Sequence, residues 1–491
     1  MHIELNRSGT SVKLFKQIAG TIADRIRSGL LAPGTRLPSV RQLSASLAVS
    51  QVTISRAYAE LESGHLITCS QGKGCFVAAS APATPAKEEA DQTWQMTLVD
   101  YLPRAQLWRN FNHQLHSRYP FHLAALHPSL LPVRDIVDNA YKHLSDNPEL
   151  MAHYGAFEGD LELRAQFAEI LRQKGIQVSA DQVLITSGAQ QGIDLVARTF
   201  VGPGDVVYVE APTYTGAIDV FTSRGAKIIM VPMDEQGMKL DMLTRLCDQH
   251  PPKLIYTNPT FHNPTGLNLS LARRKQLLEL AASYHCLIVE DDPFSELYFD
   301  SPPPPPIKSF DQGGHVVYIK SFSKILAPGC RIACMAAQGS VLSRLIAAKS
   351  TADLGSPLLT QKALLPFLTK QWGNHVSNLR KLLSRRLQIA VAVLAAHAPR
   401  RISWVTPKGG LNLWIKLPDD TDLGRLSREA DKRGISFLPG EVCYAGGTGM
   451  KEIRISYSFA GEEELKEGLK LLCELLNEDQ QPLPPEQMHV L

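Results

Sequence analysis

The sequence lacks the features of a secreted or membrane-spanning protein. Its first residues have no apolar core of the kind that a secretory signal needs, and no stretch reaches the roughly twenty uncharged apolar residues of a membrane span. The eight cysteines form no Cys-x-x-Cys pair and have no His-x-x-x-His nearby, so we expect reduced thiols and neither a disulfide framework nor a metal site. These absences predict a cytoplasmic protein with no membrane partner and no bound metal.

Charge is distributed unevenly along the chain. The whole sequence carries a net +3, but residues 1–78 hold nine Lys and Arg against four Asp and Glu, a net +5 that leaves −2 for the rest. At 491 residues the chain is also too long for one ordinary core. We therefore expect at least two domains, the first of them basic; this charge alone does not identify nucleic acid as a partner.

Helical periodicity is the main feature of the first 64 residues. Ile18 and Ile22 belong to an apolar stripe at helical spacing, which predicts an amphipathic helix. A second helix is expected to begin at Ser39, where Gln42 is placed to complete a capping box, and a third at Ser50. Two short helices joined by a tight turn indicate a helix-turn-helix.

Two β-rich runs, 66–70 and 74–77, follow the helices and predict a hairpin, or wing, with a lysine at its tip. The string Ile-Arg-Ser-Gly-Leu-Leu-Ala-Pro-Gly-Thr-Arg-Leu-Pro-Ser-Val-Arg at 26–41 resembles the winged helix-turn-helix of the GntR family of bacterial transcription regulators. A small helical domain used only for packing is the alternative. The resemblance implies that double-stranded DNA is contacted by Arg36, Arg41, Ser50, Gln51, Thr53 and Lys73.

One residue departs from the GntR pattern. The family usually has arginine after the capping serine, whereas this chain has Gln51. A glutamine amide suits adenine better than guanine, so the departure predicts a changed base preference. After this domain, placed at 1–78, the small residues, prolines and charges of 79–95 predict a linker, and the Pro- and Gln-rich stretch 477–491 a disordered tail.

Between the linker and the tail, residues 96–476 alternate short β-rich runs with helical stretches. This alternation predicts an α/β domain with a mostly parallel sheet covered on both faces. Ligands bind such sheets beyond the carboxyl ends of the strands. The expected strands lie at 183–186, 206–209, 227–231, 254–257, 287–290 and 316–319.

Polar residues follow these strands at the positions where a ligand is expected. The turn at 187–192 can direct backbone N–H groups at an anion, Tyr214 offers an aromatic face, and Asp291 sets a carboxylate at a strand end. Lys324 follows the last strand among hydroxyls, and a desolvated lysine can attack an aldehyde and hold it as a Schiff base. This chemistry suits pyridoxal 5′-phosphate (PLP).

Together these residues resemble the fold type I PLP-dependent aminotransferases over roughly residues 150–460. The resemblance implies that a smaller C-terminal α+β domain follows the sheet domain. The resemblance implies that Lys324 carries the cofactor, that Arg454 holds the carboxylate of an amino compound, and that Tyr154 reaches the phosphate of a neighbouring subunit in a homodimer. The other cofactor contacts that it implies are Gly188, Ala189, Gln190, Tyr214, Asn263, Asp291, Ser321, Ser323 and Arg331.

Two departures from the aminotransferase pattern bear on activity. Phe294 stands where these enzymes usually have a tyrosine that bonds to the ring hydroxyl, and the segment 126–132 lacks the usual Gly-x-Pro of the substrate side. Cofactor binding is therefore a firmer expectation than amino-acid turnover. Elsewhere, Arg380, Arg385 and Arg386 are expected on a solvated helix face.

A GntR-like domain joined to an aminotransferase-like domain is the arrangement of the MocR subgroup, which this chain resembles from end to end. The leading hypothesis is a PLP-dependent transcription regulator that senses PLP or an amino compound. A working aminotransferase with an appended DNA-binding domain is the second. A DNA-binding protein whose large domain serves only dimerisation is the third; replacing Lys324 would then leave regulation unchanged.

Overall fold

The protein is described here from a computed structural model, which covers residues 5, 13–27, 29–70, 73–78, 117–446 and 450–479. The chain divides into two compact units, residues 1–100 and 101–491. The expected linker lies outside the described residues, as does all of the expected tail beyond its first three residues, which are helical. Each helix that is described is too short or too polar to cross a membrane.

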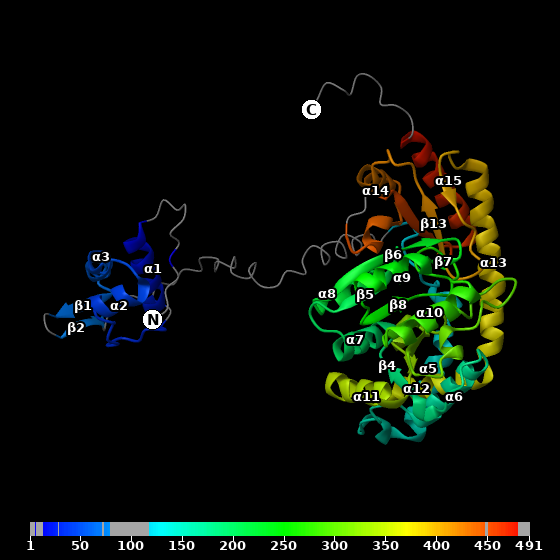
Figure 1. Cartoon of the computed structure of the whole chain (residues 1–491), viewed down its shortest axis with the longest axis horizontal. Coiled ribbons are helices and arrows are strands. Elements are labelled where there is room, and N and C mark those ends of the chain that lie inside the picture. Colours follow the sequence, from blue (N-terminus) through cyan, green and yellow to red (C-terminus); the bar gives the residue numbers. More distant parts are fainter. Residues whose placement is uncertain are drawn as a thin grey trace. The chain divides into compact units, whose positions relative to one another are not determined.

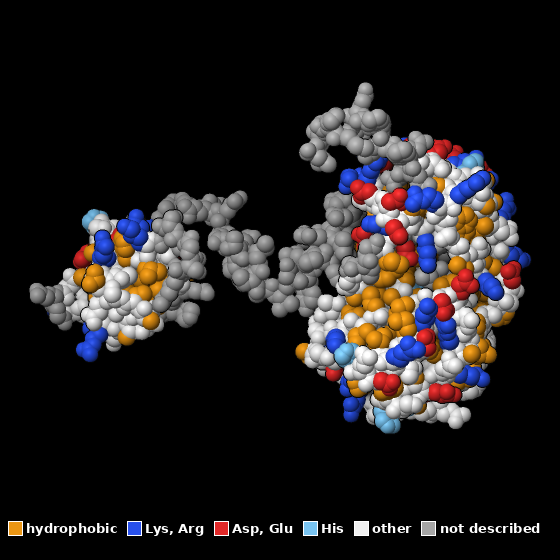
Figure 2. Space-filling view, turned by 45° about the horizontal axis from the view of Figure 1, so that its top comes forward, with side chains coloured by type: hydrophobic (Ala, Val, Ile, Leu, Met, Phe, Trp, Pro, Cys, Tyr) orange, Lys and Arg blue, Asp and Glu red, His pale blue; other side chains and the backbone are white. Residues whose placement is uncertain are grey.

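In its described residues the first unit has three helices and a hairpin, as the sequence pattern predicts. The stripe that includes Ile18 and Ile22 is fully buried against the third helix. The Ser39 side chain accepts a hydrogen bond from the backbone N–H of Gln42, and the Gln42 side chain accepts one from the backbone N–H of Ser39. The predicted capping box is therefore present. Figure 2 shows more Lys and Arg than acidic side chains on the visible face of this unit. Its elements are α1 (Leu14–Arg27), α2 (Val40–Leu47), α3 (Gln51–Ser63), β1 (Ile67–Ser70) and β2 (Gly74–Val77).

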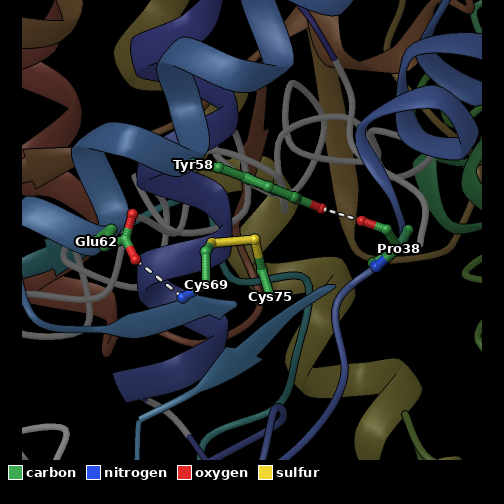
Figure 3. The surroundings of a disulfide bond; sticks show 5 residues. All are labelled: Pro38, Tyr58, Glu62, Cys69 and Cys75. Atoms are coloured by element: carbon green, nitrogen blue, oxygen red, sulfur yellow. Dashed lines mark hydrogen bonds between the residues drawn. A yellow bond between two sulfur atoms is a disulfide. The ribbon is translucent and has the colours of Figure 1, made fainter. Parts of the chain in front are cut away.

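The wing departs from expectation in one respect. Strands β1 and β2 pair antiparallel with Cys69 opposite Cys75, and a disulfide joins the two residues (Figure 3). The expectation that every cysteine is reduced is therefore wrong for this pair, since the hairpin register brings together two residues whose spacing matches no familiar motif. The backbone N–H of Cys69 also donates to Glu62 Oε1 on α3 at 2.9 Å, which ties the wing to that helix.

An eight-stranded sheet with the order β4-β11-β10-β9-β8-β5-β6-β7 forms the centre of the second unit (Figure 1). Strands β7 and β11 run antiparallel to their neighbours and the others run parallel, which confirms the mostly parallel sheet. The strands are β4 (Val183–Thr186), β5 (Val206–Ala211), β6 (Lys227–Asp234), β7 (Gly237–Met238), β8 (Leu254–Thr257), β9 (Leu287–Asp292), β10 (Val316–Ser321) and β11 (Ala333–Ala336).

Successive side chains of a strand point to opposite faces of the sheet, and every residue of β10 is buried. Both faces of the sheet are therefore covered. On β10, Tyr318 packs with α6 and α12, whereas Val317 and Ile319 pack in the cluster that contains α7 and α11. Helix α5 packs on α12. The helices are α5 (Val133–Asp146), α6 (Leu161–Arg172), α7 (Ala189–Phe200), α8 (Thr215–Ser223), α9 (Leu240–Gln249), α10 (Leu271–Ser283), α11 (Gly339–Asp353) and α12 (Leu358–Lys370).

A smaller α+β part completes the second unit, as predicted. The long helix α13 (Trp372–His397) runs along one side of the unit from the level of α12 to this part (Figure 1). A four-stranded antiparallel sheet, β12-β13-β16-β15, packs here with α13, α14 and α15. The elements are β12 (Ser403–Trp404), β13 (Asn412–Lys416), β15 (Leu438–Pro439), β16 (Glu452–Ser456), α14 (Leu423–Lys432) and α15 (Glu462–Asp479), with β14 (Ile435–Ser436) pairing parallel to β3 (Tyr119–Pro120).

Candidate functional site

A cavity of about 340 Å³ lies where the carboxyl ends of the parallel strands meet the small C-terminal part. Strand-end residues converge on it, as expected for an open α/β sheet. Residues as far apart in sequence as His122 and Arg454 therefore share one site. The sequence-predicted residues that line the cavity are Ala189, Gln190, Tyr214, Asn263, Asp291, Ser321, Lys324 and Arg454.

Lys324 lies just beyond the end of β10. Burial lowers the pKa of its ammonium to about 8, and the positive charges of Arg454 and Arg331 add to the effect. At neutral to mildly alkaline pH a sizeable fraction of the side chain is therefore the neutral amine, the form that attacks an aldehyde. The site holds a lysine prepared for Schiff-base chemistry.

Asp291 lies near the end of β9 and is buried. Its Oδ2 accepts a hydrogen bond from the Tyr256 hydroxyl at 2.8 Å, while its buried Oδ1 has no hydrogen-bond partner among the described residues. Burial raises the pKa of this carboxyl to about 7. A cationic N–H donor at Oδ1 would complete the hydrogen bonding and lower that pKa again, and a protonated pyridine ring supplies such a donor.

The backbone ahead of α7 forms an anion-binding corner. Gly188 caps this helix with φ +86°, a backbone conformation that favours glycine, and a Cβ on it would displace the Arg331 guanidinium. Arg331 Nη2 donates to the Ser187 carbonyl at 3.2 Å, which holds the guanidinium beside the helix N-terminus. Helix N–H groups and a guanidinium together suit a phosphate. Ser321 lines the cavity, whereas Ser323 does not.

Arg454, from β16, brings a guanidinium into the lining of the cavity. Its Nη1 donates to Asn263 Oδ1 at 3.0 Å and its Nη2 to the His122 carbonyl at 2.6 Å. Its buried Nε has no hydrogen-bond partner among the described residues. A buried guanidinium that has an unfilled donor and no salt bridge to a carboxylate of the described residues is suited to a ligand carboxylate.

Sequence analysis missed three residues of this site. Asn258 donates to the Asp291 carbonyl at 2.6 Å and accepts from the Asn263 backbone at 2.8 Å, which fixes the turn after β8. Tyr256 holds Asp291, as described above. His122 lines the cavity, and burial with the nearby Arg454 charge lowers its pKa to about 4, so it is neutral. The strand-end rule would have found Asn258, but no sequence signal marks His122.

The pocket of one chain has neither a hydroxyl from residue 294 nor a contribution from Tyr154. Phe294 is buried on its wall and brings no hydroxyl, as its sequence position indicates. Tyr154 is 85% exposed and is not among the residues that line this cavity. Within one chain, therefore, Tyr154 is not part of the site.

The first unit presents the expected DNA-reading residues on its surface. Gln51 is the first residue of α3 and is exposed, as are Arg41 and Lys73. Arg36 lies against the wing with its guanidinium 6.0 Å from the Phe76 ring centroid. The neighbouring residues at the wing tip, 71 and 72, lie outside the described residues.

The capping residues of α3 are less free than the sequence suggests. The Ser50 hydroxyl accepts from the backbone of Thr53 and lies 2.8 Å from the Thr53 hydroxyl. Val52, beside them, is 69% exposed and was not singled out from the sequence. An exposed valine at the start of such a helix offers an apolar contact of the kind that thymine methyl groups accept.

Each of the two units matches a known protein family. The profile of aminotransferase class I and II matches residues 123–472, and that of the bacterial regulatory proteins of the gntR family matches residues 14–77. The chain belongs to the MocR subgroup of the GntR family.

Full-length relatives share this MocR arrangement. The chain is 32% identical to YdfD of Bacillus subtilis, described as an uncharacterized HTH-type transcriptional regulator, over 94% of this chain and 96% of that protein. It is 29% identical to the HTH-type transcriptional regulator TauR of Rhodobacter capsulatus, over 93% of this chain and 95% of that protein. The kynurenine aminotransferase of Pyrococcus horikoshii superposes with a TM-score of 0.74 at 31% identity, over 79% of this chain and 97% of that one.

PLP is the cofactor of this family, and the residues present fit it. The unpartnered Oδ1 of Asp291 would hold the ring nitrogen, Lys324 the aldehyde carbon, and the Gly188 corner with Arg331 the phosphate. When bound, PLP supplies an electrophilic carbon for amines and a ring that accepts electrons.

Proposed function

We propose that this MocR-type protein is a transcription regulator in which the PLP pocket senses PLP or an amino compound and the winged helix-turn-helix binds double-stranded DNA. The observation that carries the proposal is that one chain combines two features. One is a cavity lined by Lys324, whose pKa is lowered, and by Asp291, whose Oδ1 has no hydrogen-bond partner among the described residues; the other is a helix, α3, whose first residue Gln51 is exposed. The full-length relatives YdfD and TauR carry regulator names and the same arrangement.

Within this proposal each pocket residue has a task. Lys324 would hold the aldehyde carbon of PLP, Arg454 would hold the effector carboxylate, and Asn263, which accepts from Arg454 Nη1, would also bond the ring hydroxyl. On DNA, Arg36, Arg41 and Lys73 contact phosphates, while Gln51, with the capping Ser50 and Thr53, faces base edges. A regulator acts where the DNA is, so we place the protein in the cytoplasm.

We further propose a homodimer. Side chains on and near α5 form an exposed apolar set that one chain leaves uncovered. A partner bound there explains why Tyr154 lies outside its own pocket: it would reach the phosphate of the other. The apolar set is Val133, Val137, Tyr141, Met151, Tyr154 and Phe157.

The test titrates the holo-protein with a panel of free amino acids, ω-amino acids and pyridoxamine, following the cofactor absorbance and the affinity for operator DNA together. At least one compound should change both, because a ligand shifts DNA binding only if it binds two states with different affinity. Spectral change with constant DNA affinity for every compound contradicts the proposal.

A working aminotransferase remains the second candidate, since Lys324, Asp291 and Arg454 share one cavity. Phe294 weighs against it because the cofactor hydroxyl lacks one donor. Protein free of DNA, given an amino acid and a 2-oxo acid, should under this alternative complete many turnovers, and Phe294→Tyr should raise the rate. A single half-reaction per site would exclude it.

A further inference from the structure

A second cavity, of about 780 Å³, lies in the large unit outside the PLP pocket. It is enclosed by the end of α6, the proline run 302–306 and the first turns of α13. Its volume is in the range of sites that hold small organic ligands. Apolar and aromatic side chains form much of its wall, among them Ile170, Phe310, Trp372 and Val376.

Buried charges form one side of this cavity. Glu296 is only 5% exposed, and its Oε1 lies 2.9 Å from Lys174 Nζ, which also donates to Ser295 Oγ at 2.6 Å. The other Glu296 oxygen pairs with the fully buried Lys320, which lies 3.2 Å from Asp292 Oδ1. Two carboxylates therefore balance two ammonium groups.

Arg380 adds one further positive charge to this balanced set. Its Nε donates to the Glu296 carbonyl at 2.6 Å, and its guanidinium carbon lies 3.6 Å from the Tyr298 ring centroid. The terminal nitrogens of the guanidinium have no hydrogen-bond partner within the described part of the chain, although the group lines the cavity. The prediction that Arg380 lies on a solvated face is therefore wrong, because loop 293–306 folds over it.

We propose that this cavity binds a small aromatic monocarboxylate, with the carboxylate on the terminal nitrogens of Arg380 and the ring against Trp372 and Phe310. One surplus positive charge matches a single negative charge better than the two of a phosphate monoester. An aromatic body matches the apolar wall.

The cavity shares a chain segment with the PLP pocket. Of the six residues 291–296, Asp291, Pro293 and Phe294 line the PLP pocket, whereas Ser295 and Glu296 line the second cavity. Because these residues are consecutive in the chain, a ligand that fixes one end of the segment would also restrict the other end. Acid and PLP should therefore alter each other's affinity by the same factor, as linkage requires.

Two variants test the site by independent routes. Arg380→Gln removes the guanidinium. Gly373→Phe fills the cavity from α13, where a Cβ on Gly373 meets no atom within 4 Å and helix geometry accepts the change. The matched control is Arg385→Gln on the same helix, whose side chain is 71% exposed and pairs with Glu462 at 2.9 Å.

The experiment is calorimetric titration of the full-length holo-protein with phenylacetate, which carries no amine or carbonyl able to react at the PLP pocket. Saturable binding is expected, at least about tenfold weaker in both Arg380→Gln and Gly373→Phe, unchanged in Arg385→Gln, and lost with neutral phenylacetamide. No saturable binding, equal binding by all variants, or loss only in Arg454→Gln would overturn the site. A PLP affinity that stays constant with and without the acid overturns the coupling.

Discussion

Lys324 gives the first prediction at the scale of single residues. Because its pKa is lowered to about 8, the neutral amine becomes the main form as the pH rises through that value. The initial rate of covalent PLP attachment to apo-protein should therefore increase from pH 6.5 to 9.5 with a midpoint near 8. Stopped-flow absorbance measures the rate, and Lys324→Arg, which keeps the charge but cannot attach PLP, is the control. A rate independent of pH contradicts the prediction.

Asp291 gives a second residue-scale prediction, with opposite effects on apo- and holo-protein. Its folded pKa of about 7 exceeds the unfolded value near 4, so its contribution to stability is complete below about pH 4 and is lost as the pH rises through 7. At pH 8, apo Asp291→Asn should therefore unfold at a higher temperature than wild type, with the difference shrinking toward pH 5. The same variant should bind PLP more weakly, because the pyridinium loses its counter-ion.

The comparison of wild type and Asp291→Asn must be made at both pH values, since other buried carboxyls also titrate. Glu290, whose pKa burial likewise raises to about 7, is present in both proteins and cancels in the difference. A difference in melting temperature that does not change with pH would show that Asp291 is already ionised in the apo-protein.

Residues that directly follow a strand could be predicted from the sequence, and residues that support them could not. Asp291 and Lys324 were found because strand ends meet at one edge of a parallel sheet. His122 and Tyr256 act through contacts to segments that folding alone brings near: His122 contributes its carbonyl to Arg454, more than 300 residues away. No local pattern encodes such pairs.

At the scale of elements, the wing gives the next prediction. The Cys69–Cys75 bond closes a short loop, for which chain entropy suggests about 2 kcal/mol of stabilisation. The double variant Cys69→Ser, Cys75→Ser, or wild type in reductant, should show faster amide exchange at β1 and β2. Hydrogen-exchange mass spectrometry of peptides covering 67–77 measures this. Cys247→Ser, a buried free thiol in the other unit, should leave the wing unchanged.

Helices and strands could be predicted where their residues repeat a local pattern. They could not be predicted where the element forms only by pairing with segments that are distant in sequence. The periodic α1 and the capping box of α2 follow from local spacing. Strand β11 was missed because its four residues, though apolar and buried, lie beside β4 and β10 only after folding. Arg386 was expected in solvent, but it is buried and donates to the Ser458 carbonyl, because α15 and the segment before it cover that face of α13.

At the scale of the whole molecule, the homodimer proposal predicts that the exposed apolar face of α5 controls both PLP binding and DNA binding. Val137 and Tyr141 lie one turn apart on α5 and are 58% and 74% exposed. Val137→Glu with Tyr141→Glu places two charges on this face, which one chain tolerates but an apolar interface does not. Sedimentation should show monomers. The same substitution at Leu271, an exposed apolar residue of α10, is the control.

The monomeric variant also separates what one chain does from what two chains do together. If Tyr154 completes the partner's phosphate site, PLP affinity should fall in the monomer although every residue of its own pocket is intact. DNA affinity should fall by about 10²–10⁴, because two linked recognition helices gain from the effective concentration that a dimer gives to the second half-site. Affinity for a single half-site should stay constant, since each first unit keeps its own core and recognition helix. An equal loss of affinity for half-sites and for full operators would instead mean that the charges on α5 disturb the winged helix-turn-helix itself.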